Sequence, residues 1–185
     1  CADAAAAFAV ACLLMLRREE VEGHAEALLA TPLTRVRWLL SHLPYAVLGP
    51  VLLQAVLIGG ILSVGGPSVA GQLDFMIGTA LSLLPPIWMF AGITLALTAI
   101  VPHPTPWLAW TYVVVAFSTR LLSQGFGLDE RIRFLSPFEW SGRASSSELA
   151  RTDLPWPNMI ALAALAAVLG LAAGAVLRRR DIPTP

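Results

Sequence analysis

"FMIGTALSLLPPIWMFAGITLALTAIV", residues 75–101, is a run of 27 residues without one ionisable side chain, and it decides the fold class. A membrane-spanning helix needs about 20 apolar residues. Segments 36–62, 107–122 and 158–177 meet or approach that length, and residues 1–16 have the composition of the end of another span. The chain is 57% hydrophobic and only 13% charged, with a mean hydropathy of +0.72. These features predict an all-α integral membrane protein, a polytopic helical bundle forming one transmembrane domain.

The arginines at the span ends predict the orientation in the membrane. Four full spans return the chain to the side on which it started, so residues 17–35 and the tail 178–185 share a compartment. More arginines lie near span ends on that side than on the other, where most occur within the long loop 123–157. On the first side they are Arg17, Arg18, Arg35, Arg37, Arg178, Arg179 and Arg180. The positive-inside rule makes that side cytoplasmic.

Several classes of function are disfavoured by what the chain lacks. All 12 basic residues are arginine, so there is no Walker A lysine, and any ATP-driven work needs a partner chain. The net charge is zero without a basic patch, which argues against nucleic-acid binding. The three histidines are scattered, so we expect no metal site, no catalytic residues and no cofactor in this chain.

Ionisable residues are scarce within the predicted spans. Asp3 is the odd polar member of 1–16, and Arg120 either ends the short segment 107–122 or snorkels to the interface from a longer span. Carriers driven by ions or protons usually need carboxylates or histidines at membrane depth. The scarcity of such groups disfavours a secondary transporter. The energy for any transport is therefore expected to come from outside the bilayer.

Prolines interrupt two of the predicted spans. Pro44 and Pro50 lie in 36–62, and the pair Pro85 and Pro86 lies in 75–101. Each removes a helical hydrogen bond, so these residues are either ordinary kinks or hinges beside a pathway that opens and closes.

Small residues form a stripe along the last span. Ala163, Ala167, Gly170 and Gly174 fall on one helical face. Stripes of this kind let helix backbones approach each other in membranes, so the pattern predicts close contact with a neighbouring helix.

The loop 123–157 contains a segment too apolar for a solvated loop and too interrupted to span. Around residues 132–140 it predicts a re-entrant or interfacial helix with aromatic residues at the headgroup level. The residues assigned to this outer re-entrant segment are Ser136, Pro137, Phe138 and Trp140.

Residues 17–34 form the one densely charged stretch near the start of the chain. On a helical projection Val21, Ala25, Leu28 and Leu29 share an apolar stripe. Four glutamates spread over the rest, whereas helices that simply lie on anionic lipid favour Lys and Arg. The pattern therefore favours a cytoplasmic helix that docks a basic protein surface over a plain surface helix. The next span is anchored at the interface by Arg35, Arg37 and Trp38.

The stretch "RREEVEGHAEALLATPLTRVRWLLSHL" (17–43) strongly resembles the cytoplasmic segment of the permease subunit of ABC-2-type exporters, in the group called polyketide-antibiotic or multidrug exporters. The resemblance continues through "LSPFEW" (135–140) and "RRRDI" (178–182). It implies the carboxy-terminal, six-span half of a type V exporter, with 17–34 as the coupling helix. The chain departs from the family pattern at His24, where arginine is usual, and at 139–140, where Thr-His is usual.

The resemblance also implies partners and a direction of transport. Hydrophobic or amphipathic compounds, whether drug, lipid or peptide, would leave a bacterial cell across its cytoplasmic membrane. A separate ATPase subunit, as a homodimer carrying ATP and Mg, would drive this transport, and membrane lipid would surround the permease. A second permease half would come from the same chain or from a second copy. The residues assigned to ATPase coupling are Arg18, Glu19, Glu20, Glu22, His24, Glu26, Leu28, Leu29, Thr31 and Pro32.

Two other functions stay open at this point. A structural or regulatory membrane subunit could dock a cytoplasmic partner through 17–34 and transport nothing. An intramembrane lipid-modifying enzyme would need a polar constellation at one depth, which the spans do not offer. The chain begins within an apolar run and without Met, so we expect it to be part of a longer polypeptide.

Overall fold

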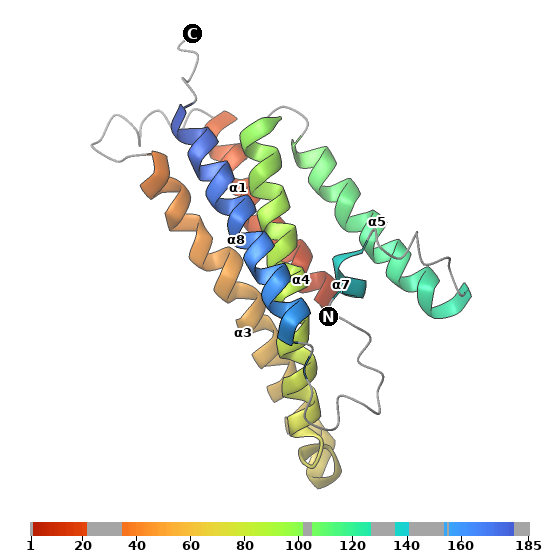
Figure 1. The fold of residues 1–185 in the computed structure, drawn as a ribbon. Coiled ribbons are helices and arrows are strands. Elements are labelled where there is room, and N and C mark those ends of the chain that lie inside the picture. The colour runs from red at the N-terminus through yellow and green to blue at the C-terminus, as the bar shows by residue number, and fades with distance from the viewer. Residues whose placement is uncertain are drawn as a thin grey trace.

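A computed structural model describes residues 2–21, 35–101, 105–126, 136–140, 154 and 156–179. All regular elements within these ranges are helices, so the prediction of an all-α protein is confirmed. They are α1 (Ala2–Val21), α3 (Arg35–Ala70), α4 (Leu73–Ile100), α5 (Thr105–Phe126), α7 (Pro137–Trp140) and α8 (Trp156–Arg179) (Figure 1).

Three of the described helices are long and apolar enough to cross a membrane, at Ser41–Gly65, Leu73–Ile100 and Trp156–Val176. This confirms a polytopic helical membrane protein. The predicted span 107–122 lies inside α5, which is not among the three. Helix α5 is long enough to cross a membrane. Its last residues, "STRLLSQGF", include several polar side chains, which lower its mean hydropathy.

The helices run alternately up and down the bundle. The end of α1, the start of α3 and the end of α8 lie at the same end of the molecule, with the end of α4 and the start of α5 (Figure 1). Helices α3, α4, α5 and α8 thus alternate in direction and return the chain to the end of the bundle at which α1 ends. Residues 17–21 continue α1, whereas we expected residue 17 to begin a separate helix.

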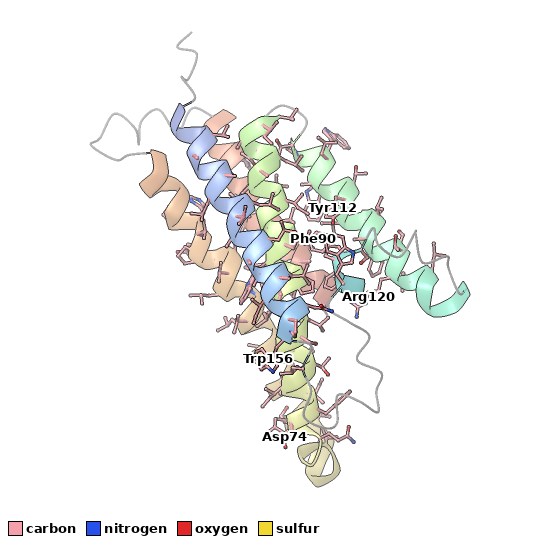
Figure 2. All side chains as sticks on the ribbon, viewed as in Figure 1. Asp74, Phe90, Tyr112, Arg120 and Trp156 are labelled. Carbon is pink, nitrogen blue, oxygen red and sulfur yellow. The ribbon has the colours of Figure 1, made fainter. Side chains whose placement is uncertain are left out.

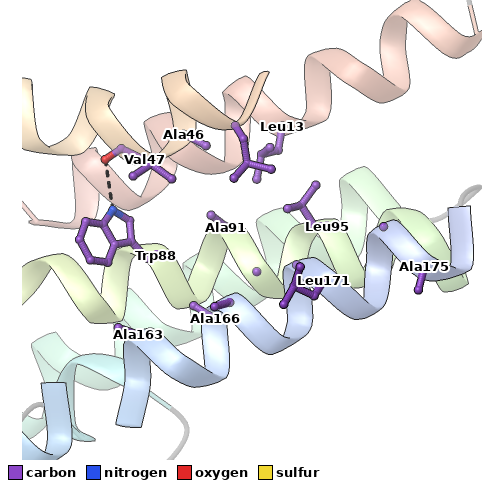
Figure 3. A pocket seen from close by; sticks show the side chains of 15 residues that line it. Leu13, Ala46, Val47, Trp88, Ala91, Leu95, Ala163, Ala166, Leu171 and Ala175 are labelled. Carbon is purple, nitrogen blue, oxygen red and sulfur yellow. Dashed lines mark hydrogen bonds between the residues drawn. The ribbon is translucent and has the colours of Figure 1, made fainter. Parts of the chain in front are cut away.

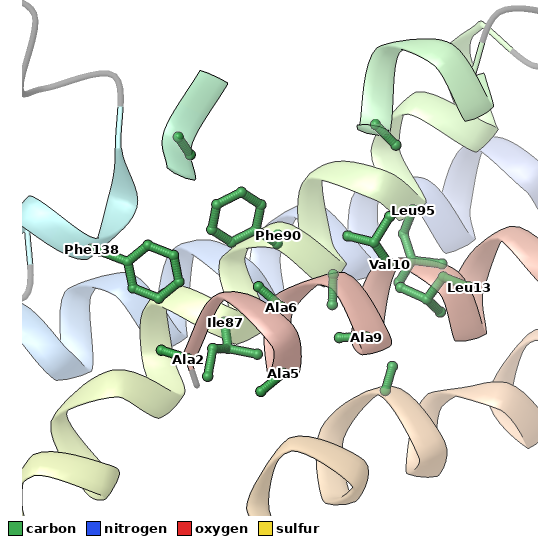
Figure 4. Packing of buried hydrophobic residues seen from close by; sticks show 14 of the residues in the cluster. Ala2, Ala5, Ala6, Ala9, Val10, Leu13, Ile87, Phe90, Leu95 and Phe138 are labelled. Atoms are coloured by element: carbon green, nitrogen blue, oxygen red, sulfur yellow. The ribbon is translucent and has the colours of Figure 1, made fainter. Parts of the chain in front are cut away.

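The core is built around α4, which contacts α1, α3, α5, α7 and α8. One face of α1 is mostly alanine and packs against α4 with Val10 and Leu13 fully buried (Figure 4). Because alanine side chains are short, α1 can lie close to both α3 and α4. On the α3 side, the ring of Phe8 occupies the place that a side chain at Gly49 would take.

Helices α3 and α4 continue through their prolines. Pro50, Pro85 and Pro86 are buried, and Pro44 is exposed. Near them, two side chains bond across the pair of helices. The amide of Gln54 donates to the Ala80 carbonyl (3.1 Å), and Nε1 of Trp88 donates to the Val47 carbonyl (3.1 Å). The hinge role of the four prolines stays a prediction.

Helices α3 and α4 form a hairpin that extends past the lower ends of α5 and α8 (Figure 1). With 36 residues α3 measures about 54 Å, well beyond the ~30 Å of a bilayer's hydrocarbon core. The turn of the hairpin lies at 71–72, and Asp74 is exposed beside it (Figure 2).

Candidate functional site

A cavity of about 640 Å³ lies between α3, α4 and α8, with Leu13 of α1 contributing to its wall (Figure 3). Its lining is almost entirely Ala, Gly, Leu and Val. Trp88 is the only lining residue in the described chain whose side chain carries a hydrogen-bonding group. The lining residues are Leu13, Leu43, Ala46, Val47, Trp88, Ala91, Gly92, Leu95, Ala163, Ala166, Ala167, Gly170, Leu171, Gly174 and Ala175.

The small residues of α8 make room for this cavity. Ala163, Ala167, Gly170 and Gly174, for which close helix contact was expected, all line it. A Cβ atom at Gly170 would only reach ordinary contact with Leu95, 3.9 Å away. The tight backbone contact occurs elsewhere on α4 and α8, so the α8 stripe leaves space as well as permitting contact. The helical periodicity of the sequence identified this face of α8. It could not show that the described side chains opposite leave a cavity beside that face.

That tight contact is centred on Gly92 of α4. A Cβ atom there would lie 2.9 Å from the carbonyl oxygen of Ala166 and 3.1 Å from its Cα. Because these are backbone atoms, they cannot move aside as a flexible side chain can. Gly92 therefore sets the distance between α4 and α8 at the floor of the cavity.

Besides Trp88, a second polar feature lies where α1, α5 and α7 meet. Arg120 of α5 donates from one nitrogen to both carboxylate oxygens of Asp3 on α1, at 3.2 Å each. The guanidinium also lies 5.1 Å from the ring centre of Phe138 on α7. Helix α5 continues beyond residue 122 to Phe126, and Arg120 is held within it by a carboxylate and an aromatic ring. Snorkelling of Arg120 to the interface stays a prediction. We call Asp3, Arg120 and Phe138 the charged junction.

An aromatic cluster continues the junction into the core. Phe138 lies 5.5 Å from Phe90, and Phe90 lies 5.1 Å from Tyr112, measured between ring centres. Figure 2 shows Phe90 of α4 next to Tyr112 of α5, with Arg120 farther along α5. The cluster joins α4, α5 and α7 through side chains that are apolar except at the tyrosine hydroxyl.

The predicted re-entrant residues lie in and beside α7. Ser136, Pro137 and Phe138 are buried, while Trp140 is partly exposed and packs near Met89 and Leu162. The Ser136 hydroxyl has no hydrogen-bond partner among the described atoms. These four residues thus belong to the packed bundle, against α4 and α5, and their outer-loop role stays a prediction.

The predicted coupling residues are described only in part. The side chain of Arg18 is exposed near the end of α1, where the backbone of Glu19 and Glu20 is also helical. The backbone of Arg35, Arg37 and Trp38 lies in the first turns of α3. The remaining seven lie outside the described residues: Glu22, His24, Glu26, Leu28, Leu29, Thr31 and Pro32. Within the described ranges, no group of three or more His, Cys, Asp or Glu could hold a metal ion.

The apolar helices around α4 define a multi-pass membrane protein, here a bacterial one. Residues 1–178 match the family described as the C-terminal domain of the multidrug efflux system permease Rv1217c, and the chain belongs to that family. The prediction of a C-terminal permease half is thereby confirmed.

A curated relative agrees with the family match. The chain is 35% identical to the multidrug efflux system permease protein Rv1217c of Mycobacterium tuberculosis (strain ATCC 25618 / H37Rv). The similarity covers 96% of this chain and 32% of the relative, so the chain spans about a third of that protein's length.

Proposed function

We propose that this chain is part of the transmembrane permease of an ATP-driven, ABC-2-type exporter that moves hydrophobic or amphipathic compounds out of the cell. Membership of a family described as a multidrug efflux permease domain carries this proposal. The apolar cavity is consistent with it, because ligand sites for such compounds are mostly apolar. The described residues that line the cavity include no acid, base or nucleophile, which favours a transporter over an enzyme.

The energy would come from a separate ATPase subunit, a homodimer holding ATP and Mg, through residues 17–34. Residues 1–185 contain no lysine and so no Walker A motif, and ATP hydrolysis would therefore take place outside them. Residues 22–34 connect α1 to α3, and both helices contribute to the cavity wall, through Leu13 and through Leu43, Ala46 and Val47. A movement imposed on the connection would therefore act directly on two walls of the cavity.

Reversing the charges of Glu19 and Glu20 should uncouple export from ATP hydrolysis. With both changed to Arg in the full-length protein, ATP-dependent dye export from inverted vesicles is expected to fall at least roughly tenfold, because like charges then meet the basic docking surface. The variant should insert normally and should no longer co-purify with the ATPase.

Asp74→Arg provides a matched charge reversal at the opposite end of the bundle, where Asp74 is exposed, and it should leave export unchanged. Retained export and co-purification in the double variant would refute coupling through these glutamates. If the ATPase co-purifies with the unaltered protein but no compound is exported, the chain is instead a non-transporting subunit that docks a cytoplasmic partner.

A further inference from the structure

We propose that the cavity between α3, α4 and α8 binds neutral, apolar, elongated molecules and excludes organic cations. This proposal rests on the proposed function, because the molecule bound in the cavity is taken to be the exported compound. The volume of about 640 Å³ lies within the roughly 300–1,000 Å³ typical of small-molecule sites. Four helices contribute to its wall, so it is a hollow in the bundle and not the outer face of one helix.

The chemistry of the lining selects against charge. The one side-chain hydrogen-bonding group, the indole N–H of Trp88, already donates to the Val47 carbonyl. Asp3 lies about 15 Å from Leu13 along α1 and is paired with Arg120. A cation in the cavity would therefore lose its hydration without gaining a carboxylate, which is strongly unfavourable. A neutral compound loses little hydration there and gains apolar contact.

The shape of the cavity favours elongated molecules. Its lining on α8 runs from Ala163 to Ala175, about 18 Å along the helix axis, but covers only one turn of α3, from Leu43 to Val47. The half-buried Trp88 adds an aromatic surface, on which ring systems stack favourably. Linked aromatic rings fit this combination.

A lipid acyl chain is a weaker candidate for the occupant. The lipid would also need contacts for its headgroup, and no charged or hydroxyl side chain is among the described residues of the lining. The bond between Trp88 and Val47 also joins α3 to α4 at the wall (Figure 3), as part of a preformed site. The fit therefore favours an elongated compound of linked rings over an acyl chain.

The test uses benzophenone, a neutral diaryl ketone that inserts into nearby C–H bonds under near-ultraviolet light. The full-length permease in lipid nanodiscs is irradiated with increasing benzophenone, without nucleotide, and labelled residues are mapped by mass spectrometry. Saturable labelling is expected at Leu43, Val47, Leu95 and Leu171. Diphenylmethane, which is neutral, should compete, and tetraphenylphosphonium at the same concentration should not.

Two variants fill the cavity from different positions on α8. Gly170→Leu and Ala163→Leu should each lower labelling by roughly tenfold or more, since the added carbons occupy volume that the probe needs. Having two such variants keeps the test valid if one fails to fold. Gly60→Leu is the matched control: a Cβ there meets nothing within 4 Å and lies outside the cavity, so labelling should be unchanged.

Labelling spread over the outer faces of α3 and α8, equal in the cavity-filling variants, would overturn the proposal. So would equal competition by tetraphenylphosphonium, or labelling that appears only after bound phospholipid is stripped. Cavity-specific labelling by a compound that is not exported would support the site and reject the exporter. Export of diphenyl compounds with labelling elsewhere would support the exporter and reject the site.

Discussion

Arg120→Ala is expected to destabilise the bundle and abolish export. The change removes the charge paired with Asp3 and the cation over Phe138, and so loosens α1, α5 and α7 together. Breaking a fully buried ion pair costs about 3–5 kcal/mol, since the remaining charge is left without a partner. The side chains of Arg120 and Asp3 are 28% and 24% exposed, so we expect a cost on the order of 2–3 kcal/mol. Denaturant unfolding of the purified full-length protein measures it.

Two further variants separate charge from geometry at the charged junction. Arg120→Lys keeps the charge but lacks the planar guanidinium, so its stability should lie between those of the wild type and the alanine variant. Exchanging the two charges, as Asp3→Arg with Arg120→Asp, should restore more stability than the sum of the single changes predicts. Wild-type stability in Arg120→Ala would show that the pair contributes nothing.

Gly92→Val is expected to force α4 and α8 apart. Its Cβ would meet the Ala166 backbone at 2.9 Å, so one helix must shift. Overpacking of this kind costs about 1–3 kcal/mol, and a β-branched residue has little freedom to avoid the contact. Thermal unfolding in detergent should show the loss, and export should fall because the floor of the cavity is displaced.

Gly78→Val on the same helix is the control for helix propensity. A Cβ at Gly78 meets nothing within 4 Å, so this change should alter stability little. If the two glycine variants unfold alike, close packing between α4 and α8 does not limit stability.

The sequence predicts the apolar helices well where composition alone decides. The predicted spans 75–101 and 158–177 lie close to Leu73–Ile100 and Trp156–Arg179. The span predicted at 36–62 ends eight residues before α3, which continues through "GGPSVA" to Ala70. Gly and Pro usually interrupt helices, so this extension of α3 could not be predicted from the local sequence.

The charged junction and the cavity could not be predicted in this way. Asp3 and Arg120 are separated by 117 positions, and no local pattern connects them. The small-residue face of α8 was identifiable from the sequence. Whether that face packs closely or lines a cavity depends on the side chains opposite it. Gly92 supplies the close contact with Ala166, whereas no large side chain fills the space beside Gly170.

The length of the α3–α4 hairpin has a mechanical consequence. Trp88 and Gln54 bond the two helices to each other at two levels in the middle of α3, which favours rotation of the hairpin as one unit. If the pair turned by about ten degrees about the Arg35 end of α3, its tip would move by roughly 9 Å over the helix length of about 54 Å. A small rotation at the Arg35 end would thus produce a displacement wider than a phenyl ring at the turn at 71–72.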